Sequence, residues 1–242
     1  MFASSDGLRA RLDVVRQRIA EACRRAGRPA SSVALVAVTK QVPAEVMRQA
    51  LGLGVTDVGE NRVQEAGDKR EALTGVAARW HLIGHLQRNK AKLAVTLFDI
   101  VHSVDTPELA GALGRHAQAS GRVLDALIQV NMSGEATKHG CRPETAQHLA
   151  ETVLATAGLR WRGLMTIAPA VQDAEQARPH FRRLRELRDT LARALGADRA
   201  ALQLSMGMSQ DFDVVIEEGA DLVRIGSAIF HPLPRAIQES SG

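Results

Sequence analysis

Polar and apolar positions follow one repeating pattern along this chain. A short run of β-branched and other apolar residues is followed by a turn residue, and then by a longer stretch with apolar residues three and four positions apart. The short runs are typical of buried strands, and the longer stretches are typical of amphipathic helices. The pattern predicts eight strands, at residues 33–39, 55–59, 80–84, 100–104, 123–131, 161–165, 202–206 and 222–225.

Helices are predicted between these strands, and several have recognisable ends. The DTPE stretch at 105–108 supplies a cap, a first-turn proline and a first-turn acid. Gly158 and Gly196 follow two other helical stretches as C-terminal stops. One further helix precedes the first strand. The helices with both ends predicted lie at 7–26, 43–53, 62–72, 143–157 and 171–195.

Eight alternations of strand and helix within 242 residues are typical of a (β/α)8 barrel. The sequence therefore predicts an α/β fold, a TIM barrel that forms a single domain over residues 1–242, with the helix at 7–26 as an addition. A doubly wound sheet is the alternative, but it more often carries a glycine-rich fingerprint after its first strand. Here the first strand ends in TKQVP, which favours the barrel.

Composition agrees with a globular α/β protein. The chain is 45% hydrophobic and 24% charged, which is enough apolar mass for a core. No apolar run approaches the roughly 20 residues that span a bilayer, and the N-terminal stretch MFASSDGLRARLDVVRQRIA resembles an amphipathic helix rather than a signal peptide. Two distant cysteines, Cys23 and Cys141, favour a reducing, cytoplasmic setting without disulfides.

The positive charge of the chain does not point to nucleic acid. The net charge is +4, but the densest arginine segment, 181–199, has leucines at helical spacing. Its arginines are therefore predicted to form the solvated face of an amphipathic helix. Aromatic residues are only 3% of the chain, so bases would find few side chains to stack on.

The first predicted strand, within VALVAVTK at 33–40, is followed by Lys40. A solvated lysine at the tip of a strand is the ordinary interpretation, and a Schiff-base nucleophile at the mouth of a pocket is the alternative. In a barrel, functional groups follow the carboxyl ends of the strands. Besides Lys40, the residues in such positions are 59–61, 84–85, 103–105, 131, 165–166, 205–209 and 224–227.

Two of these strand ends, SMGMS at 205–209 and RIGSA at 224–228, consist mainly of small residues with hydroxyls. They follow the seventh and eighth strands, where many barrels bind phosphate through backbone N–H groups; turns and a cap at Ser209 are the alternative. A lysine and a phosphate site at one mouth suit a ligand with an aldehyde and a phosphate. Pyridoxal 5′-phosphate (PLP) is the first candidate and a phosphorylated sugar aldehyde the second. Partial burial of Lys40 and the charge of Arg224 would favour the neutral, nucleophilic amine.

Seven motifs occur in order along the chain: VALVAVTK, VGENRVQEA, WHLIGHLQRNK, VHSVDT, QVNMSGEATKHG, GLMTIAP and LSMGMSQDFDVVIEEGADLVRIGSAIF. Together they resemble the pyridoxal phosphate homeostasis proteins, which are single-domain relatives of the N-terminal barrel of bacterial alanine racemase. The resemblance extends over residues 32–230. It implies a barrel like the alanine racemase N-terminal domain, with PLP as its cofactor.

The resemblance also implies roles for the matching residues. Lys40 resembles the lysine that forms the internal aldimine with PLP. Asn61 resembles a residue that contacts the cofactor on the side of its ring hydroxyl, and His81 resembles a residue of the pocket wall near the ring. Arg224 resembles the partner of the pyridine nitrogen. The phosphate cup is implied for residues of both loops: Ser205, Met206, Gly207, Ser209, Gly226 and Ser227.

Two of these residues have an alternative structural interpretation. Asn61 is also placed to cap the helix at 62–72, with Gln64 in the reciprocal position. Arg224 can instead form a salt bridge to an acid such as Glu217 or Asp221. In both alternatives the side chain has a structural partner within the protein and does not contact a ligand.

The histidines do not predict a metal site. His81 and His85 have i,i+4 spacing, but on a strand-to-loop segment and without a flanking glutamate. His102, His139 and His180 are scattered and are interpreted as satisfied groups on the surface or behind the site. After AIF the sequence continues as HPLP at 231–234, which departs from the family pattern.

The resemblance implies a PLP-binding protein of intracellular PLP homeostasis, which delivers the cofactor to apo PLP-dependent enzymes. The alternatives are a PLP-dependent amino-acid racemase and a Schiff-base aldolase. A racemase needs a second acid/base group, in alanine racemase a tyrosine from another domain; this sequence has no tyrosine and stops soon after the eighth strand. The aldolase lacks a paired acid and a second lysine at the strand ends. We therefore expect a monomeric carrier that is not an enzyme and binds neither nucleic acid nor membrane.

Overall fold

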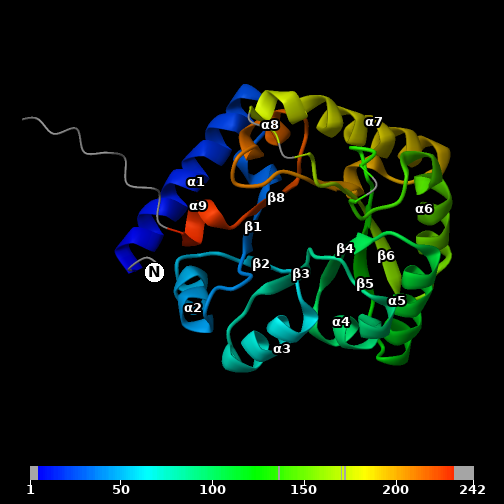
Figure 1. The fold of residues 1–242 in the computed structure, drawn as a ribbon, viewed down its shortest axis with the longest axis horizontal. Helices are drawn as coiled ribbons and strands as arrows, with labels where there is room; N and C mark the ends of the chain where they lie inside the picture. The colour runs from blue at the N-terminus through cyan, green and yellow to red at the C-terminus, as the bar shows by residue number, and fades with distance from the viewer. Residues whose placement is uncertain (1–4, 136, 170, 172, 232–242) are drawn as a thin grey trace, which may run out of the picture.

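The computed structural model describes residues 5–135, 137–169, 171 and 173–231, so most of the HPLP stretch lies outside the described residues. Eight parallel strands form a closed barrel in sequence order, with β8 hydrogen-bonded to β1. The helices surround this barrel (Figure 1). The strands are β1 (Ala34–Val38), β2 (Asp57–Glu60), β3 (Arg79–Leu82), β4 (Ile100–Val104), β5 (Leu124–Gln129), β6 (Leu159–Met165), β7 (Gln203–Ser205) and β8 (Leu222–Ile225).

Helices follow the strands in the order that the sequence pattern predicts. The helix α1 precedes β1 and packs against α8 and α9 (Figure 1). The helices are α1 (Ser5–Arg25), α2 (Ala44–Gly52), α3 (Val63–Ala72), α4 (Ala91–Leu97), α5 (Pro107–Ala119), α6 (Ala146–Ala155), α7 (Arg178–Ala194), α8 (Phe212–Glu217) and α9 (Ser227–Phe230). Short 3₁₀ helices lie at Ala30–Ser32, Arg88–Lys90, Pro143–Thr145, Ala174–Ala177 and Arg199–Ala201.

Over the described part of the chain, the buried apolar residues form two separate cores. The larger core lies between the sheet and the helices. The smaller one fills the inside of the barrel with Val36, Ile100, Leu127, Met165 and Leu222. Because side chains alternate between the faces of a strand, His102 shares the inner face with Ile100, and Arg224 shares it with Leu222. The inside of the barrel therefore carries buried polar side chains as well as apolar ones.

The predicted barrel is confirmed, and the pairing of β8 with β1 rules out the open, doubly wound sheet. The cap predicted for α3 is wrong. The N-cap residue of α3 is Arg62, without a side-chain hydrogen bond, so Asn61 and Gln64 do not form a capping pair. No helix of the described segments is long and apolar enough to cross a membrane.

The arginine-rich helix α7 is amphipathic, with one exception to the predicted solvated face. Phe181, Leu184 and Leu191 are buried as the spacing predicts. Arg188 is also buried, because its guanidinium donates to Asp189 and to a backbone carbonyl between α7 and β7. This arginine stabilises the packing of α7 and is not available to a ligand.

Candidate functional site

The predicted nucleophile and the two predicted phosphate loops lie at the same end of the barrel. All eight strands are parallel, so the residues that follow them meet at one mouth. Lys40 follows β1, and Gly226 follows β8, which pairs with β1. The two strand ends touch, since a Cβ atom at Gly226 would lie 3.2 Å from the Cβ of Val38. The loop at 205–209 follows β7, the other neighbour of β8.

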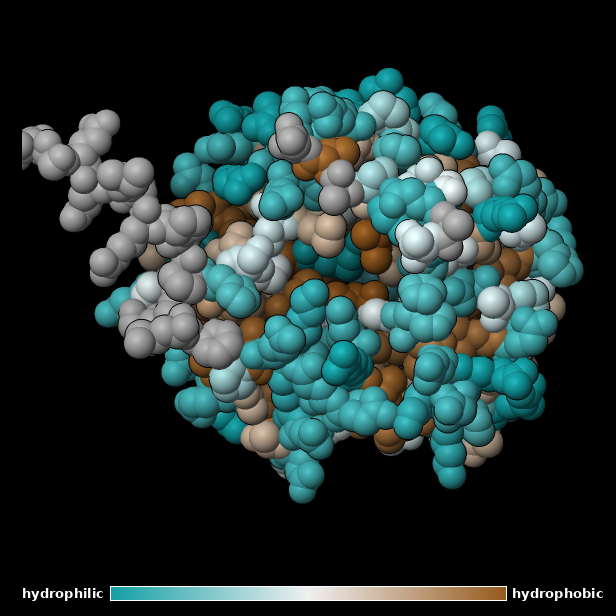
Figure 2. Space-filling model, viewed as in Figure 1, coloured by the Kyte–Doolittle hydropathy of each residue, from teal (hydrophilic) through white to brown (hydrophobic). Residues whose placement is uncertain are grey.

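The centre of the face shown in Figure 2 combines polar and apolar surface. Hydrophilic side chains lie in the middle of the barrel, and hydrophobic side chains surround them. A separate surface hollow lies at the amino ends of β1 and β2, lined among others by Arg16, Thr56 and Asp57. That hollow contains none of the predicted site residues, so the carboxyl mouth is the candidate site.

Lys40 is exposed, whereas the residue before it is buried. We expected partial burial of Lys40, but it lies in the turn after β1, where the side chain has already left the sheet. The hydroxyl of Thr39 donates to Glu60 Oε1 at 2.6 Å. On the other side of Lys40, Gln41 has a φ of 60°, a left-handed conformation that non-glycine residues seldom adopt. The turn therefore needs support from its surroundings.

A buried ion-pair cluster provides this support. Lys69 of α3 is 7% exposed, and its ammonium donates to Glu60 at 2.7 Å and to Glu65 at 2.6 Å. The same ammonium donates to the backbone carbonyl of Thr39 at 2.5 Å. Glu65 in turn accepts the backbone N–H of Gln41 at 2.5 Å. Because it is costly to break a buried ion pair, this cluster holds the backbone on both sides of the candidate nucleophile.

Asn61 lies half-buried at the mouth, directly after β2. Its backbone packs against Gly84, which follows β3. A Cβ atom at Gly84 would lie 2.3 Å from the carbonyl oxygen of Asn61, so only glycine permits this approach. The contact joins the ends of β2 and β3 and places Asn61 at the rim.

The two predicted phosphate loops contact one another. Gly207 has a φ of 86°, and a Cβ atom there would lie 2.4 Å from a methyl group of α8, so the first loop needs glycine. The carbonyl of Gly207 accepts the N–H of Arg224 at 3.1 Å. Ser209 Oγ accepts the N–H of Ala228 at 3.3 Å and is not the cap of α8, whose N-cap residue is Asp211. Of the predicted cup residues, Ser209 and Gly226 are half-buried, Ser227 is exposed, and three are buried: Ser205, Met206 and Gly207.

Arg224 is buried, with 4% of its surface exposed. Its guanidinium donates to Ser205 Oγ at 2.6 Å and to the carbonyl of Thr166 at 2.8 Å. The alternative salt bridge to Glu217 or Asp221 is wrong, because those carboxylates pair with arginines of α1, α7 and the loop after α1. Arg224 therefore belongs to the interior of the barrel.

Within the described residues, no carboxylate pairs directly with this guanidinium. Burial lowers the pKa of Arg224 to about 10, and the charge of Asp211 opposes this effect. The group remains protonated at neutral pH, so the barrel contains a buried positive charge without a counter-ion at contact distance. Such a charge is costly, and perturbed groups of this kind cluster at functional sites.

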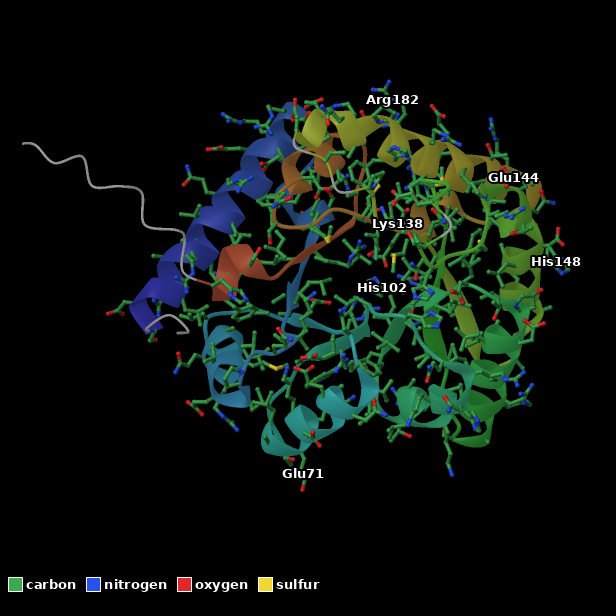
Figure 3. All side chains as sticks on the ribbon, in the orientation of Figure 1. Glu71, His102, Lys138, Glu144, His148 and Arg182 are labelled. Atoms are coloured by element: carbon green, nitrogen blue, oxygen red, sulfur yellow. The ribbon has the colours of Figure 1, made fainter. Side chains whose placement is uncertain are left out.

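A chain of hydrogen bonds continues from Arg224 through the barrel. Ser205 Oγ lies 2.8 Å from Nδ1 of His102, and Nε2 of His102 lies 2.8 Å from Nδ1 of His81. Nε2 of His81 lies 2.9 Å from Oδ1 of Asp57. Both rings are 0% exposed, and Figure 3 places His102 near the middle of the barrel. The chain therefore links the mouth to the amino end of β2.

The charged ends of this chain determine its direction. Arg224 can only donate, so the hydroxyl of Ser205 accepts from it and donates to Nδ1 of His102. His102 then donates from Nε2 to His81, which donates from Nε2 to the carboxylate of Asp57. Burial would raise the pKa of Asp57, but hydrogen bonds from His81 and a threonine outweigh it and lower that pKa. Burial lowers the pKa of both histidines, that of His102 most, so both rings are neutral.

We expect these histidines to make the fold acid-sensitive. In the unfolded chain they bind a proton near pH 6.5, whereas the folded state keeps them neutral at lower pH. Above about pH 6.5 the histidines do not lower the free energy of unfolding. Below that pH, each ring lowers it by up to about 1.4 kcal/mol per pH unit, because the unfolded chain binds a proton that the folded protein does not. The free energy of unfolding in urea should fall less between pH 7.5 and pH 5.5 in His102→Gln than in the wild type.

The control for this measurement is His148→Gln, since His148 is an exposed histidine of α6 (Figure 3). The free energy of unfolding of His148→Gln should fall between pH 7.5 and pH 5.5 by as much as that of the wild type. Asp57, whose pKa is lowered, loses its contribution only below about pH 4, outside this window. If the free energy of unfolding of His102→Gln falls by as much as that of the wild type, the buried rings do not cause the decrease.

His81 is expected to form a pocket wall near the ring of the cofactor. In the structure its ring has no exposed surface and bonds to Asp57 and His102 inside the barrel. His102 lies behind Ser205 and is not on the surface. His180 Nδ1 lies 3.0 Å from the carbonyl of Met132. The hydrogen-bond chain therefore connects His81 and His102 to the mouth through Ser205 and Arg224.

Comparison with known proteins identifies the family. The family model named "Alanine racemase, N-terminal domain" matches residues 11–234. The chain is also 46% identical over 220 residues to the pyridoxal phosphate homeostasis protein of Aquifex aeolicus, which covers 91% of this chain and 96% of the relative. This chain belongs to the pyridoxal phosphate homeostasis protein family.

Solved structures agree with this family and its fold. PipY of Synechococcus elongatus without PLP has a TM-score of 0.82 at 36% identity, covering 92% of this chain and 99% of that one. PipY with PLP bound has a TM-score of 0.76 at 37% identity, covering 88% and 99%. Alanine racemase from Clostridium difficile has a TM-score of 0.73 at 14% identity and covers 95% of this chain but only 57% of the racemase. The racemase therefore shares the barrel fold with the homeostasis family.

Proposed function

We propose that this protein binds PLP at the carboxyl mouth of the barrel as an aldimine of Lys40. In this proposal it holds the cofactor for PLP homeostasis and delivers it to apo PLP-dependent enzymes. The observation that carries the proposal is an exposed lysine beside two loops with glycines and hydroxyls, at one mouth. A ligand with both an aldehyde and a phosphate can engage both features. The names of the relatives and the PLP bound to PipY support this ligand.

The donor set of the mouth fits an anionic cofactor. The hydroxyls of Ser209 and Ser227 and the backbone N–H groups of both loops can donate to phosphate oxygens. The buried charge of Arg224 has no carboxylate at contact distance within the described residues, so an anionic ligand would compensate it. The amine of Lys40 would form a C=N bond with the aldehyde carbon and release one water molecule.

The same residues favour holding the cofactor over amino-acid chemistry. PLP serves enzymes as an electron sink, which is strongest when its ring nitrogen is protonated. The guanidinium of Arg224 can only donate, so at the ring nitrogen it would disfavour that protonation. The exposed Lys40 leaves the bond open to water, which favours exchange. The sequence also lacks the tyrosine that alanine racemase uses as its second acid/base group.

Cofactor transfer tests this function. PLP-loaded protein is mixed with the apo form of a PLP-dependent enzyme, and the recovered activity is followed in the presence of a scavenger of free PLP. A carrier should restore activity despite the scavenger and should not invert L-alanine. Sustained inversion of L-alanine at about 1 s⁻¹ or faster would identify an enzyme instead. Failure to retain PLP after gel filtration would contradict the proposal as a whole.

A further inference from the structure

Three residues with metal-binding groups meet at the mouth, after three successive strands. His85 follows β3, Asp105 follows β4, and His139 lies in the loop after β5. One ligand atom from each residue lies within 4.8 Å of the ligand atoms of the other two. None of the three belongs to the phosphate loops or to the hydrogen-bond chain of Arg224. The cluster is therefore a feature of its own.

The carboxylate is the fixed member of this cluster. The side chain of Asp105 is only 11% exposed and accepts the backbone N–H of Gly140. Its Oδ2 lies 3.7 Å from Nδ1 of His85. Burial raises the pKa of Asp105, and the neighbouring His85 and His139 oppose the shift. A cation bound at this carboxylate would offset the cost of its burial.

The two imidazoles are the adjustable members. The rings of His85 and His139 stack with their centroids 3.9 Å apart and their planes at 9°. A nitrogen binds a metal ion along a lone pair in the plane of its ring, so stacked rings must tilt before both reach one ion. Both residues are exposed, which leaves room for that rotation.

We propose that His85, Asp105 and His139 bind one divalent transition-metal ion, with Zn²⁺ as the best match. Two imidazoles and a carboxylate form a zinc ligand set, at metal–ligand distances of about 2.0–2.2 Å. In a tetrahedral site such ligand atoms lie roughly 3.3–3.6 Å apart. The 3.7 Å between Asp105 Oδ2 and His85 Nδ1 is close to this range. No ligand-atom separation in the cluster exceeds 4.8 Å, so the atoms would need to approach by at most about 1 Å. Three protein ligands leave a fourth position for water, or for a carboxylate or amine.

The proposed site differs from the expectation that the sequence supports. His81 and His85 have i,i+4 spacing in the sequence, but without a flanking glutamate this pair predicts no metal site. In the structure the partners of His85 come from the next two strand ends, while His81 lies inside the barrel. The proposed ion would occupy the β3–β5 side of the mouth, away from the phosphate loops after β7 and β8.

Isothermal titration of the untagged, PLP-free chain with ZnCl₂ tests the site. We expect one Zn²⁺ per chain, and at least about tenfold weaker binding in His85→Ala, Asp105→Asn and His139→Ala. The matched control is His148→Ala, an exposed histidine on the outer helix α6 (Figure 3), which should bind Zn²⁺ like the wild type. Because PLP is absent, this result does not depend on the proposed carrier function.

Histidine NMR provides a second measurement that needs no variant. On addition of Zn²⁺ to wild-type protein, the ring signals of His85 and His139 should shift together at one equivalent, because the stack opens. The buried rings of His81 and His102 should remain unchanged. Equal Zn²⁺ binding by wild type and all three variants, or no shift of the His85 and His139 signals, would overturn the proposal.

Discussion

Replacing Lys40 by alanine should abolish the visible absorption of PLP-loaded protein, because the C=N bond requires this amine. The wild type should leave gel filtration yellow, since a covalent bond survives the separation. The Lys40→Ala protein should leave it colourless, with PLP held only by the loops and Arg224. Absorption spectra before and after the column measure the difference, and we expect a complete loss of the band.

The matched control is Lys92→Ala, an exposed lysine of the outer helix α4, which should remain yellow. Lys40→Arg keeps the positive charge without a nucleophilic amine and should be colourless too. Borohydride reduction followed by peptide mass spectrometry locates the bond directly. A yellow Lys40→Ala protein would contradict the assignment and point to another amine, such as Lys138 near the middle of the barrel in Figure 3.

Replacing Arg224 by glutamine should weaken PLP binding by roughly 10- to 150-fold, which corresponds to the 1.5–3 kcal/mol of a hydrogen bond with a charged group. The substitution removes a buried cation that would face the cofactor, and it leaves Ser205 without its charged donor. Equilibrium dialysis against PLP measures the affinity. Arg224→Lys keeps the charge but loses the bidentate geometry of the guanidinium. Its affinity for PLP should therefore lie between those of the wild type and Arg224→Gln.

Arg188→Gln separates ligand binding from folding in this experiment. Arg188 is as buried as Arg224 but pairs with Asp189 on α7. Its loss should lower the free energy of unfolding and leave the affinity for PLP unchanged. Loss of the unpaired charge of Arg224 should destabilise the PLP-free protein less than loss of Arg188. Equal PLP affinities of the Arg224→Gln and Arg188→Gln proteins would refute a cofactor contact by Arg224.

Much of the barrel follows from the local pattern of the sequence. The strands predicted at 100–104 and 222–225 have the bounds of β4 and β8, because apolar runs end there at polar or turn residues. The starts of β3 and β6 lie one and two residues earlier than predicted. Arg79 is the first residue of β3 and Arg160 is the second residue of β6. Both arginines pair with Asp125 of β5. Such a partner across the sheet has no signal in a local pattern.

The candidate site is predictable in its parts but not in its contacts. Strand-end position and residue type identify Lys40 and the two loops, and the family resemblance adds their roles. The contact of Arg224 with Thr166 joins residues 58 positions apart, so the nearer acids along the chain were the natural but wrong alternative. The sequence places Lys69 four residues after Glu65 on one helix, but it does not show that both reach the turn at Gln41.

The firmly held turn around Lys40 bears on how a cargo would enter and leave. The main chain is tied at Thr39 and Gln41, while the lysine side chain extends into solvent. Loading and release would then need only rotations about side-chain bonds, which take picoseconds to nanoseconds at exposed positions. The pace of handover would be set by imine formation and hydrolysis. The PLP-loaded and PLP-free proteins would also have nearly the same surface shape. A recipient enzyme would therefore have to distinguish them by contacts at the mouth itself.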